Sequence, residues 1–121
     1  MSPEQTVNAF IAAVERGDLE GALSHLSPDC EYDNVPMSKA IGTEEIRGVL
    51  AMFVSPDQKT EFEIVRQAAS GDLVMNERID RLQIGDKHVE LAVAGVFEVR
   101  DGRIVLWRDY FDLATLTGQM A

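Results

Sequence analysis

Apolar residues near the start of the chain recur three and four positions apart, the spacing of one buried helix face. In the first such segment they are Val7, Phe10, Ile11 and Val14. Ser2, followed by Pro3 and Gln5, forms the pattern of a capping box, so we expect a helix from Pro3 to about residue 16. Gly17 can close this helix in a left-handed conformation.

Two further helices are expected before residue 60. Asp18 can cap a short second helix, which the proline-containing segment 27–29 ends. Thr43 can cap a third helix, which Ser55 and Pro56 stop. Their buried faces would consist of Leu19, Ala22, Leu23 and Leu26 in the second helix, and of Ile46, Val49, Leu50 and Phe53 in the third.

After residue 60 the hydrophobic period changes from about 3.6 to about 2, as in β-strands. The four segments with this period are 60–69, 73–84, 87–100 and 103–112. Short turns with Gly71, Gly85 and Gly102 separate them, so neighbouring strands should pair as antiparallel hairpins. Helices followed by a long meander indicate one α+β domain over residues 1–121. Strands this long curve, and helices that cover the concave face of a curved sheet enclose a pocket.

Charge and cysteine content restrict the range of partners. The 21 acidic residues exceed the 11 basic ones and give a formal charge of −10, which would repel nucleic acids and anionic membranes. The single cysteine, Cys30, excludes an intramolecular disulfide and is expected to be a small buried thiol. The N-terminal residues are polar and no long apolar run follows, so we expect no signal peptide or membrane anchor and a cytoplasmic protein.

Three pairs of polar residues interrupt the extended segments, and the members of each pair are two positions apart. They are Tyr32 and Asn34, Arg78 and Asp80, and Trp107 and Asp109. Both members of such a pair point to one face of a sheet. The first pair stands on a short extended piece before Pro36, which is suited to an edge strand.

The pattern leaves open whether these pairs face the pocket or the solvent. The alternate positions on the two long strands are equally polar, namely Glu77, Ile79 and Arg81, and Arg108, Tyr110 and Asp112. Facing outward, the pairs would form a solvated face with cross-strand ion pairs. Facing inward, an arginine between two carboxylates would bridge them and leave a net charge of about −1. Burial and mutual repulsion would then keep one carboxyl protonated and the other ionised, an acid and a base in one site.

Together these residues resemble the limonene-1,2-epoxide hydrolase family. The motifs that carry the resemblance are Tyr32-Asp33-Asn34, Glu77-Arg78-Ile79-Asp80 and Trp107-Arg108-Asp109-Tyr110-Phe111-Asp112-Leu113. The resemblance extends from about Thr6 to Leu116, and the segment from Phe10 to Tyr32 is also similar to the wider nuclear-transport-factor-2-like, or SnoaL-like, superfamily. It implies a strongly curved, mixed but mostly antiparallel sheet that forms a cone-like half-barrel, in which the N-terminal helices cover a deep apolar pocket.

The resemblance also implies a role for each of five residues. Asp109 corresponds to the general base, and Tyr32 and Asn34 correspond to the residues that hold the attacking water. Asp80 corresponds to the general acid that protonates the epoxide oxygen, and Arg78 to the bridge between the two carboxylates. Water would open the epoxide to a vicinal diol in one step, without a covalent intermediate, metal or cofactor.

The expected substrate is a small, uncharged, lipophilic epoxide. Trp107 matches a pocket-wall position of the family. The other residues expected to contact the substrate are Leu82, Leu91, Val93, Phe97, Met52 and Phe53. A homodimer is expected from the resemblance and from apolar residues such as Tyr110 on the outer face of the sheet. His25 and His88 lack the spacing of a metal site and should have surface or capping roles.

Two other functions stay open at this point. A ketosteroid-isomerase-like or polyketide-cyclase-like enzyme on the same fold would move a proton beside a carbonyl with one carboxylate, and would not need a bridging arginine and a second acid. A binder of a small apolar ligand would need neither acid nor base, because a fold does not determine function. The sequence lacks glycine-rich phosphate loops and serine or cysteine nucleophile motifs, which argues against nucleotide binding and acyl transfer.

Overall fold

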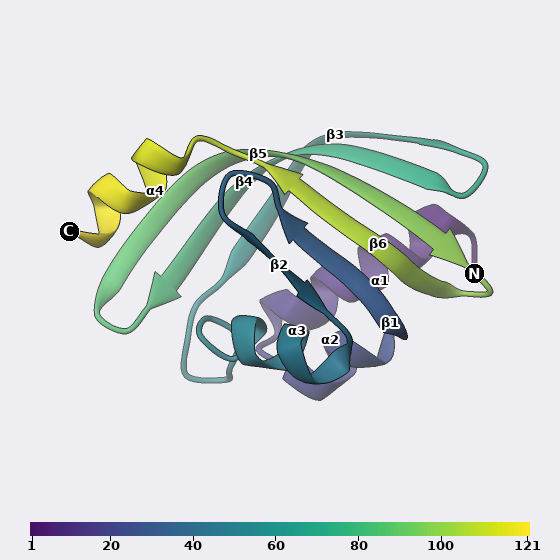
Figure 1. Cartoon of the computed structure of the whole chain (residues 1–121), viewed down its shortest axis with the longest axis horizontal. Coiled ribbons are helices and arrows are strands. Elements are labelled where there is room, and N and C mark those ends of the chain that lie inside the picture. The colour runs from purple at the N-terminus through teal and green to yellow at the C-terminus, as the bar shows by residue number, and fades with distance from the viewer.

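The computed structural model describes residues 1–121 and contains four helices and one six-stranded sheet (Figure 1). The helices are α1 (Pro3–Glu15), α2 (Leu19–Ser24), α3 (Thr43–Leu50) and α4 (Leu113–Met120). The strands are β1 (Leu26–Asn34), β2 (Ser38–Ile41), β3 (Glu61–Ser70), β4 (Leu73–Ile84), β5 (Lys87–Arg100) and β6 (Arg103–Tyr110). None of these helices combines the length and the apolar character that crossing a membrane requires.

The predicted caps of the first two helices are confirmed. The Ser2 hydroxyl accepts the Gln5 backbone N–H at 3.1 Å, and the Gln5 side chain accepts the Ser2 N–H at 2.9 Å. Asp18 accepts the Gly21 N–H at 2.9 Å and so caps α2. Between the two helices Gly17 has a φ of 73°, and a Cβ there would collide with the Ser55 carbonyl.

The start of α3 and the end of α2 differ from the prediction. Gly42, with a φ of 86°, is the N-cap of α3 in place of Thr43, because the chain leaves β2 and turns into the helix at that glycine. The helix α2 ends at Ser24, and Leu26 opens β1. Pro28 lies within β1, where an irregularity in the pairing with β6 tolerates the missing N–H.

The sheet has the order β2-β1-β6-β5-β4-β3. The predicted antiparallel meander from β3 to β6 is confirmed, and the parallel pairing of β1 with β6 makes the sheet mixed. The expectation that Tyr32 and Asn34 lie on an edge strand is wrong. The unpredicted strand β2 pairs antiparallel with β1 and forms the edge, with Ala40 opposite Tyr32.

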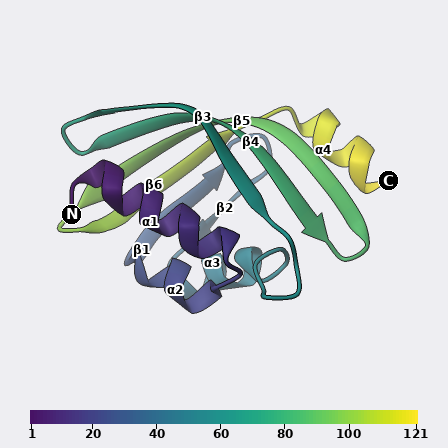
Figure 2. The same cartoon turned by 180° about the vertical axis from the view of Figure 1, so that it is seen from behind.

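The curved sheet and its helices form the cone-like α+β fold that the resemblance implies. The helix α1 crosses the concave side of the sheet, and α2 and α3 extend the same layer toward β1 and β2 (Figure 2). The predicted stripe of α1 packs into the main core, where Phe10 and Trp107 are fully buried. The hydrophobic pattern does not predict α4, which packs against β5 at the end of the molecule away from the N-terminus (Figure 1).

Candidate active site

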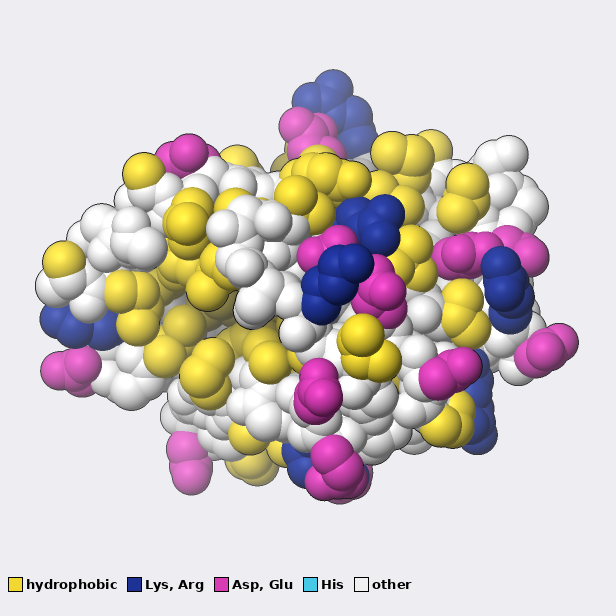
Figure 3. All heavy atoms as spheres, viewed as in Figure 1, with side chains coloured by type: hydrophobic (Ala, Val, Ile, Leu, Met, Phe, Trp, Pro, Cys, Tyr) yellow, Lys and Arg dark blue, Asp and Glu magenta, His cyan; other side chains and the backbone are white.

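A cavity of about 360 Å³ opens on the concave side of the sheet. Fourteen of its 19 lining residues are hydrophobic, so its interior suits an apolar molecule. The polar lining residues include Asn34, Asp80 and Asp109, and Tyr32 of β1 lines the same part of the cavity; these residues come from β1, β4 and β6. Figure 3 shows a hollow bordered by hydrophobic side chains between α4 and the part of the molecule that contains α3 and β2.

Arg78 joins the two carboxyl groups at the base of this cavity. Its Nε and Nη2 donate to the two oxygens of Asp80 at 3.0 and 2.9 Å, and Nη2 also donates to Oδ2 of Asp109 at 3.0 Å. Arg78 is fully buried, and Asp80 and Asp109 are each 4% exposed. Of the two arrangements that the sequence pattern leaves open, the structure therefore has the inward one.

The bridge depends on a glycine in the strand between the two carboxylates. Because β5 separates β4 from β6, the Arg78 side chain must pass over β5 to reach Asp109. It passes at Gly95, which is paired with Asp109 on one side and with Asn76 on the other. A Cβ on Gly95 would collide with Nη1 of Arg78 and would lie 2.8 Å from Oδ1 of Asn76.

Asp109 is also held by the aromatic side chain two positions before it. The indole Nε1 of Trp107 donates to Oδ1 of Asp109 at 3.0 Å. The Tyr32 ring stacks on Trp107 with a centroid distance of 3.7 Å and an interplanar angle of 8°. The parallel register of β1 and β6 sets Tyr32 beside Trp107 and Asn34 beside Asp109. Tyr32 and Asn34 are thereby brought into the cavity next to Asp109.

Burial dominates the electrostatics of the site. Loss of solvent raises the pKa of Asp80 to about 6, against the opposing effect of Arg78. Burial likewise raises the pKa of Asp109, again opposed by Arg78. Burial and the charge of Asp109 raise the pKa of Tyr32, so its phenol stays protonated at neutral pH. Burial disfavours charge on Arg78, but Asp109 and Asp80 outweigh it and raise the pKa of Arg78, so one fixed cation faces two carboxyls that hold protons more tightly than usual.

The structure distributes the residues expected to contact substrate between the cavity and the core. Those that line the cavity are Leu82, Leu91, Val93, Met52 and Phe53. Trp107 and Phe97, which we expected in the pocket wall, do not line it and are fully buried. They stack on each other with a centroid distance of 6.2 Å, because the space between α1 and the sheet is filled by an aromatic cluster behind Asp109.

Several residues of the site have no counterpart in the sequence prediction. Asn76 is 5% exposed and accepts from Nη1 of Arg78 at 2.9 Å. Its position two residues before Arg78 is the same signal that singled out Asp80. The cavity wall also includes Leu116, Thr117 and Met120 of α4. The signal for α4 is its cap, because Asp112 accepts the Thr115 N–H at 3.0 Å.

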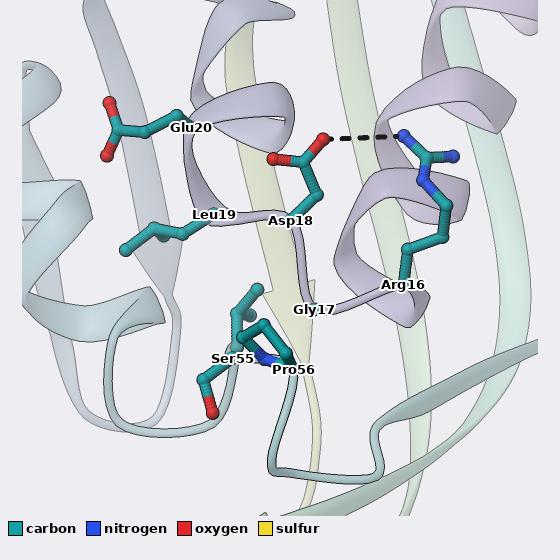
Figure 4. Close-up of a pocket in the computed structure, with 8 residues that line it drawn as sticks. Arg16, Gly17, Asp18, Leu19, Glu20, Ser55 and Pro56 are labelled. Carbon is teal, nitrogen blue, oxygen red and sulfur yellow. Dashed lines mark ion pairs between the residues drawn. The ribbon is translucent and has the colours of Figure 1, made fainter.

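A second hollow lies between the α1–α2 turn and the segment that follows α3 (Figure 4). Its charged side chains include Arg16 and Asp18, which pair at 3.6 Å with 62% and 48% of their side-chain surfaces exposed. These charges are solvated, and the hollow has no buried acid and base like those of the first cavity, so we assign no site here. No three His, Cys, Asp or Glu side chains are grouped to hold a metal ion; His25 caps the end of α2 and His88 is exposed.

Comparison with known proteins identifies relatives by sequence and by structure. The family model described as limonene-1,2-epoxide hydrolase catalytic domain matches residues 1–121. The epoxide hydrolase EphG of Mycobacterium tuberculosis is 40% identical over 107 residues, which cover 88% of this chain and 71% of that protein.

Solved structures agree with the sequence relatives. The structure of a limonene-epoxide-hydrolase-like epoxide hydrolase from Mycobacterium tuberculosis has a TM-score of 0.81 at 38% identity, covering 98% of this chain and 89% of that one. A putative polyketide cyclase from Pseudomonas putida has a TM-score of 0.82 at 21% identity, covering 100% and 99% of the two chains, which shows a shared fold alone. With a family match over its whole length, this chain belongs to the limonene-1,2-epoxide hydrolase family.

Proposed function

We propose that this protein is an epoxide hydrolase that adds water to a small lipophilic epoxide and releases a vicinal diol. The observation that carries the proposal is the pair of buried carboxyls, Asp80 and Asp109, joined by Arg78 at the base of an apolar cavity. The names of the relatives at 40% and 38% identity support it. An isomerase or cyclase that uses one carboxylate would not need the second acid and its bridge.

Asp109 acts as the general base in this proposal. Its two oxygens accept from different groups, Trp107 and Arg78, and hydrogen bonds to a carboxylate favour its ionised form. Tyr32 and Asn34 extend into the cavity beside it and can hold a water for deprotonation. As Asp109 takes a proton, the water oxygen forms a bond to an epoxide carbon.

Asp80 acts as the general acid. With a pKa raised to about 6, it keeps a protonated fraction close to neutral pH. The breaking carbon–oxygen bond gives its electron pair to the epoxide oxygen, which takes the proton of Asp80. The new carboxylate remains paired with Nε and Nη2 of Arg78, and exchange with solvent returns Asp80 and Asp109 to their starting protonation states. No ester to the protein forms in this sequence of steps.

We also propose that the outer face of the sheet carries a homodimer interface. Met75 and Tyr110 are 56% and 46% exposed there, and Tyr110 lies beside Ala94 in the register. Exposed apolar side chains bordered by charged ones such as Glu77 are typical of a surface that a partner covers. Sedimentation equilibrium should give twice the chain mass of 13.4 kDa, and Tyr110→Glu should lower it toward one chain. The cytoplasmic location stays a prediction from the sequence.

Product analysis tests the hydrolase directly. The protein is incubated with limonene oxide or cyclohexene oxide, and diol is measured in ordinary water and in water enriched in heavy oxygen. We expect diol, with the label in its new hydroxyl in the first turnover. An unchanged epoxide would refute the hydrolase and favour a ligand binder, and unlabelled first-turnover diol would indicate an ester intermediate.

Variants on β4 and β6 separate the roles of the two carboxyls. Asp80→Asn and Asp109→Asn should each lower kcat by about 10² or more, because each removes a proton transfer. Glu77→Gln is the control, since Glu77 lies between Asn76 and Arg78 on β4 but faces solvent. It should keep the wild-type rate. Near-wild-type turnover by either aspartate variant would contradict its assigned role.

A further inference from the structure

Asn76 is a buried polar residue that contacts Arg78 on the side away from the two carboxylates. Its Oδ1 accepts from Nη1 of Arg78 at 2.9 Å. The two residues are two positions apart on β4 and share its inner face. The guanidinium is therefore held on three sides, by Asp80, Asp109 and Asn76.

A chain of amide hydrogen bonds leads from Asn76 to the first turn of α1. The Nδ2 of Asn76 donates to Oε1 of Gln67 at 3.0 Å. The Nε2 of Gln67 donates to Oε2 of Glu4 at 3.1 Å and to Oδ1 of Asn8 at 2.9 Å. Arginine only donates and an ionised carboxylate only accepts. With Arg78 at one end and Glu4 at the other, each amide between them has a single orientation that satisfies all these bonds.

We propose that Asn76 is a positioning residue that orients the Arg78 guanidinium between Asp80 and Asp109, and that Gln67 and Glu4 fix the orientation of Asn76. Arg78 makes two hydrogen bonds to Asp80 and one to Asp109. A guanidinium released on the Nη1 side would therefore keep Asp80 and lose Asp109 first. The effect of Asn76 on the reaction rests on the proposed hydrolase function.

The variant Asn76→Asp tests this geometry while keeping the size of the side chain. It sets a third carboxylate against Arg78, which then shares its charge among three acceptors, so Asp80 and Asp109 should bind protons more tightly. Three charged groups of the site, Arg78, Asp80 and Asp109, also shift the pKa values of these two carboxyls and of Tyr32. Outside the site, the carboxyl of Glu15 at the end of α1 raises the pKa of Asp80.

Trp107 supplies a readout that needs no substrate. It is the only tryptophan and donates to Asp109, so its fluorescence should follow the titration of the carboxyl pair. We expect Asn76→Asp to move the fluorescence midpoint to higher pH by about 0.5 unit or more. For diol formation we expect kcat to fall about tenfold with KM nearly unchanged, because the cavity lining is intact.

A second pair of variants applies if Asn76→Asp fails to fold. Both Gln67→Leu and Gln67→Glu lose the donor to Glu4 and Asn8, but Gln67→Leu also removes the acceptor of the Asn76 amide, whereas Gln67→Glu keeps an acceptor oxygen at that place. Gln67 is only partly buried, so both changes should be tolerated. We expect kcat to fall several-fold in Gln67→Leu, with KM unchanged, and to stay closer to the wild-type value in Gln67→Glu.

The outcomes separate the positioning role from the hydrolase function. Absence of diol from the wild-type protein would overturn the proposed function, and the fluorescence midpoint would still test the role of Asn76. Diol formation by the wild type, together with an unchanged midpoint and kcat in a folded Asn76→Asp variant, would overturn the positioning role alone. Equal kcat in both Gln67 variants and the wild type would overturn it as well.

Discussion

The indole of Trp107 donates a hydrogen bond of 3.0 Å to Oδ1 of Asp109, and the two residues are 0% and 4% exposed. This bond and the one from Arg78 take different oxygens of the carboxylate and so fix the plane of the group. The Tyr32 ring stacks on one face of the indole and so helps to hold the indole in place. The aromatic core of the protein thus determines how the proposed base faces the cavity.

Trp107→Phe should therefore slow hydrolysis although Trp107 does not line the cavity. A phenyl ring keeps much of the stacking with Tyr32 but cannot donate to Asp109. We expect kcat to fall about tenfold, and stability to fall by about 1 to 3 kcal/mol because a buried acceptor loses its partner. Steady-state kinetics and thermal unfolding measure the two effects. Phe10→Leu, which changes the edge contact on Trp107 but no bond to Asp109, should destabilise the fold with much less effect on kcat.

The raised pKa of Asp80 predicts a pH dependence of the reaction. Because burial raises this pKa to about 6, the free enzyme loses the proposed acid proton as the pH rises past that value. We expect kcat/KM to fall on the alkaline side with an apparent pKa close to 6, a value that belongs to the coupled carboxyl pair. Initial rates from about pH 4 to about pH 8, two units either side of that pKa, measure it. A flat profile across this range would contradict proton donation by Asp80.

Gly95→Ala should disable the bridge from a neighbouring strand. A methyl group there collides with Nη1 of Arg78 and lies 3.1 Å from Oδ1 of Asp109. We expect the variant to lose about 1 to 3 kcal/mol of stability. We also expect its kcat to fall more than the kcat of core variants that lose the same amount of stability. Gly48→Ala is the control, because a Cβ at Gly48 on α3 meets no atom within 4 Å. Equal kcat in the two alanine variants would show that the bridge tolerates displacement.

The parts of the fold that the sequence predicts are those with local causes. The capping of α1 by Ser2 and the glycine turns at Gly71 and Gly85 act within a few residues, so periodicity and turn residues identify them. The parallel pairing of β1 with β6 has no such signal. It joins residues as distant as Leu26 and Ile104, and Pro28 within β1 reads locally as a breaker.

The candidate site also has parts that the sequence pattern predicts and parts that it does not. A spacing of two puts Arg78 and Asp80 on one face of β4, but the reach of Arg78 to Asp109 depends on Gly95 in the strand between them. That relationship needs the register of three strands. The hydrophobic pattern does not predict the helix α4, because none of its residues is buried, although Leu116 lines the cavity.

The helix α4 forms one wall of the cavity and should therefore affect substrate size. Gln119 holds this helix to β5 through hydrogen bonds of 2.8 and 2.9 Å with the backbone of Glu90. Leu116→Trp should place an indole in the cavity, and we expect KM for limonene oxide to rise about tenfold, with a smaller rise for cyclohexene oxide. Leu113→Trp is the matched control, because Leu113 lies on the same helix but does not line the cavity. If the two tryptophan variants changed both KM values equally, α4 would not bound the space that the substrate occupies.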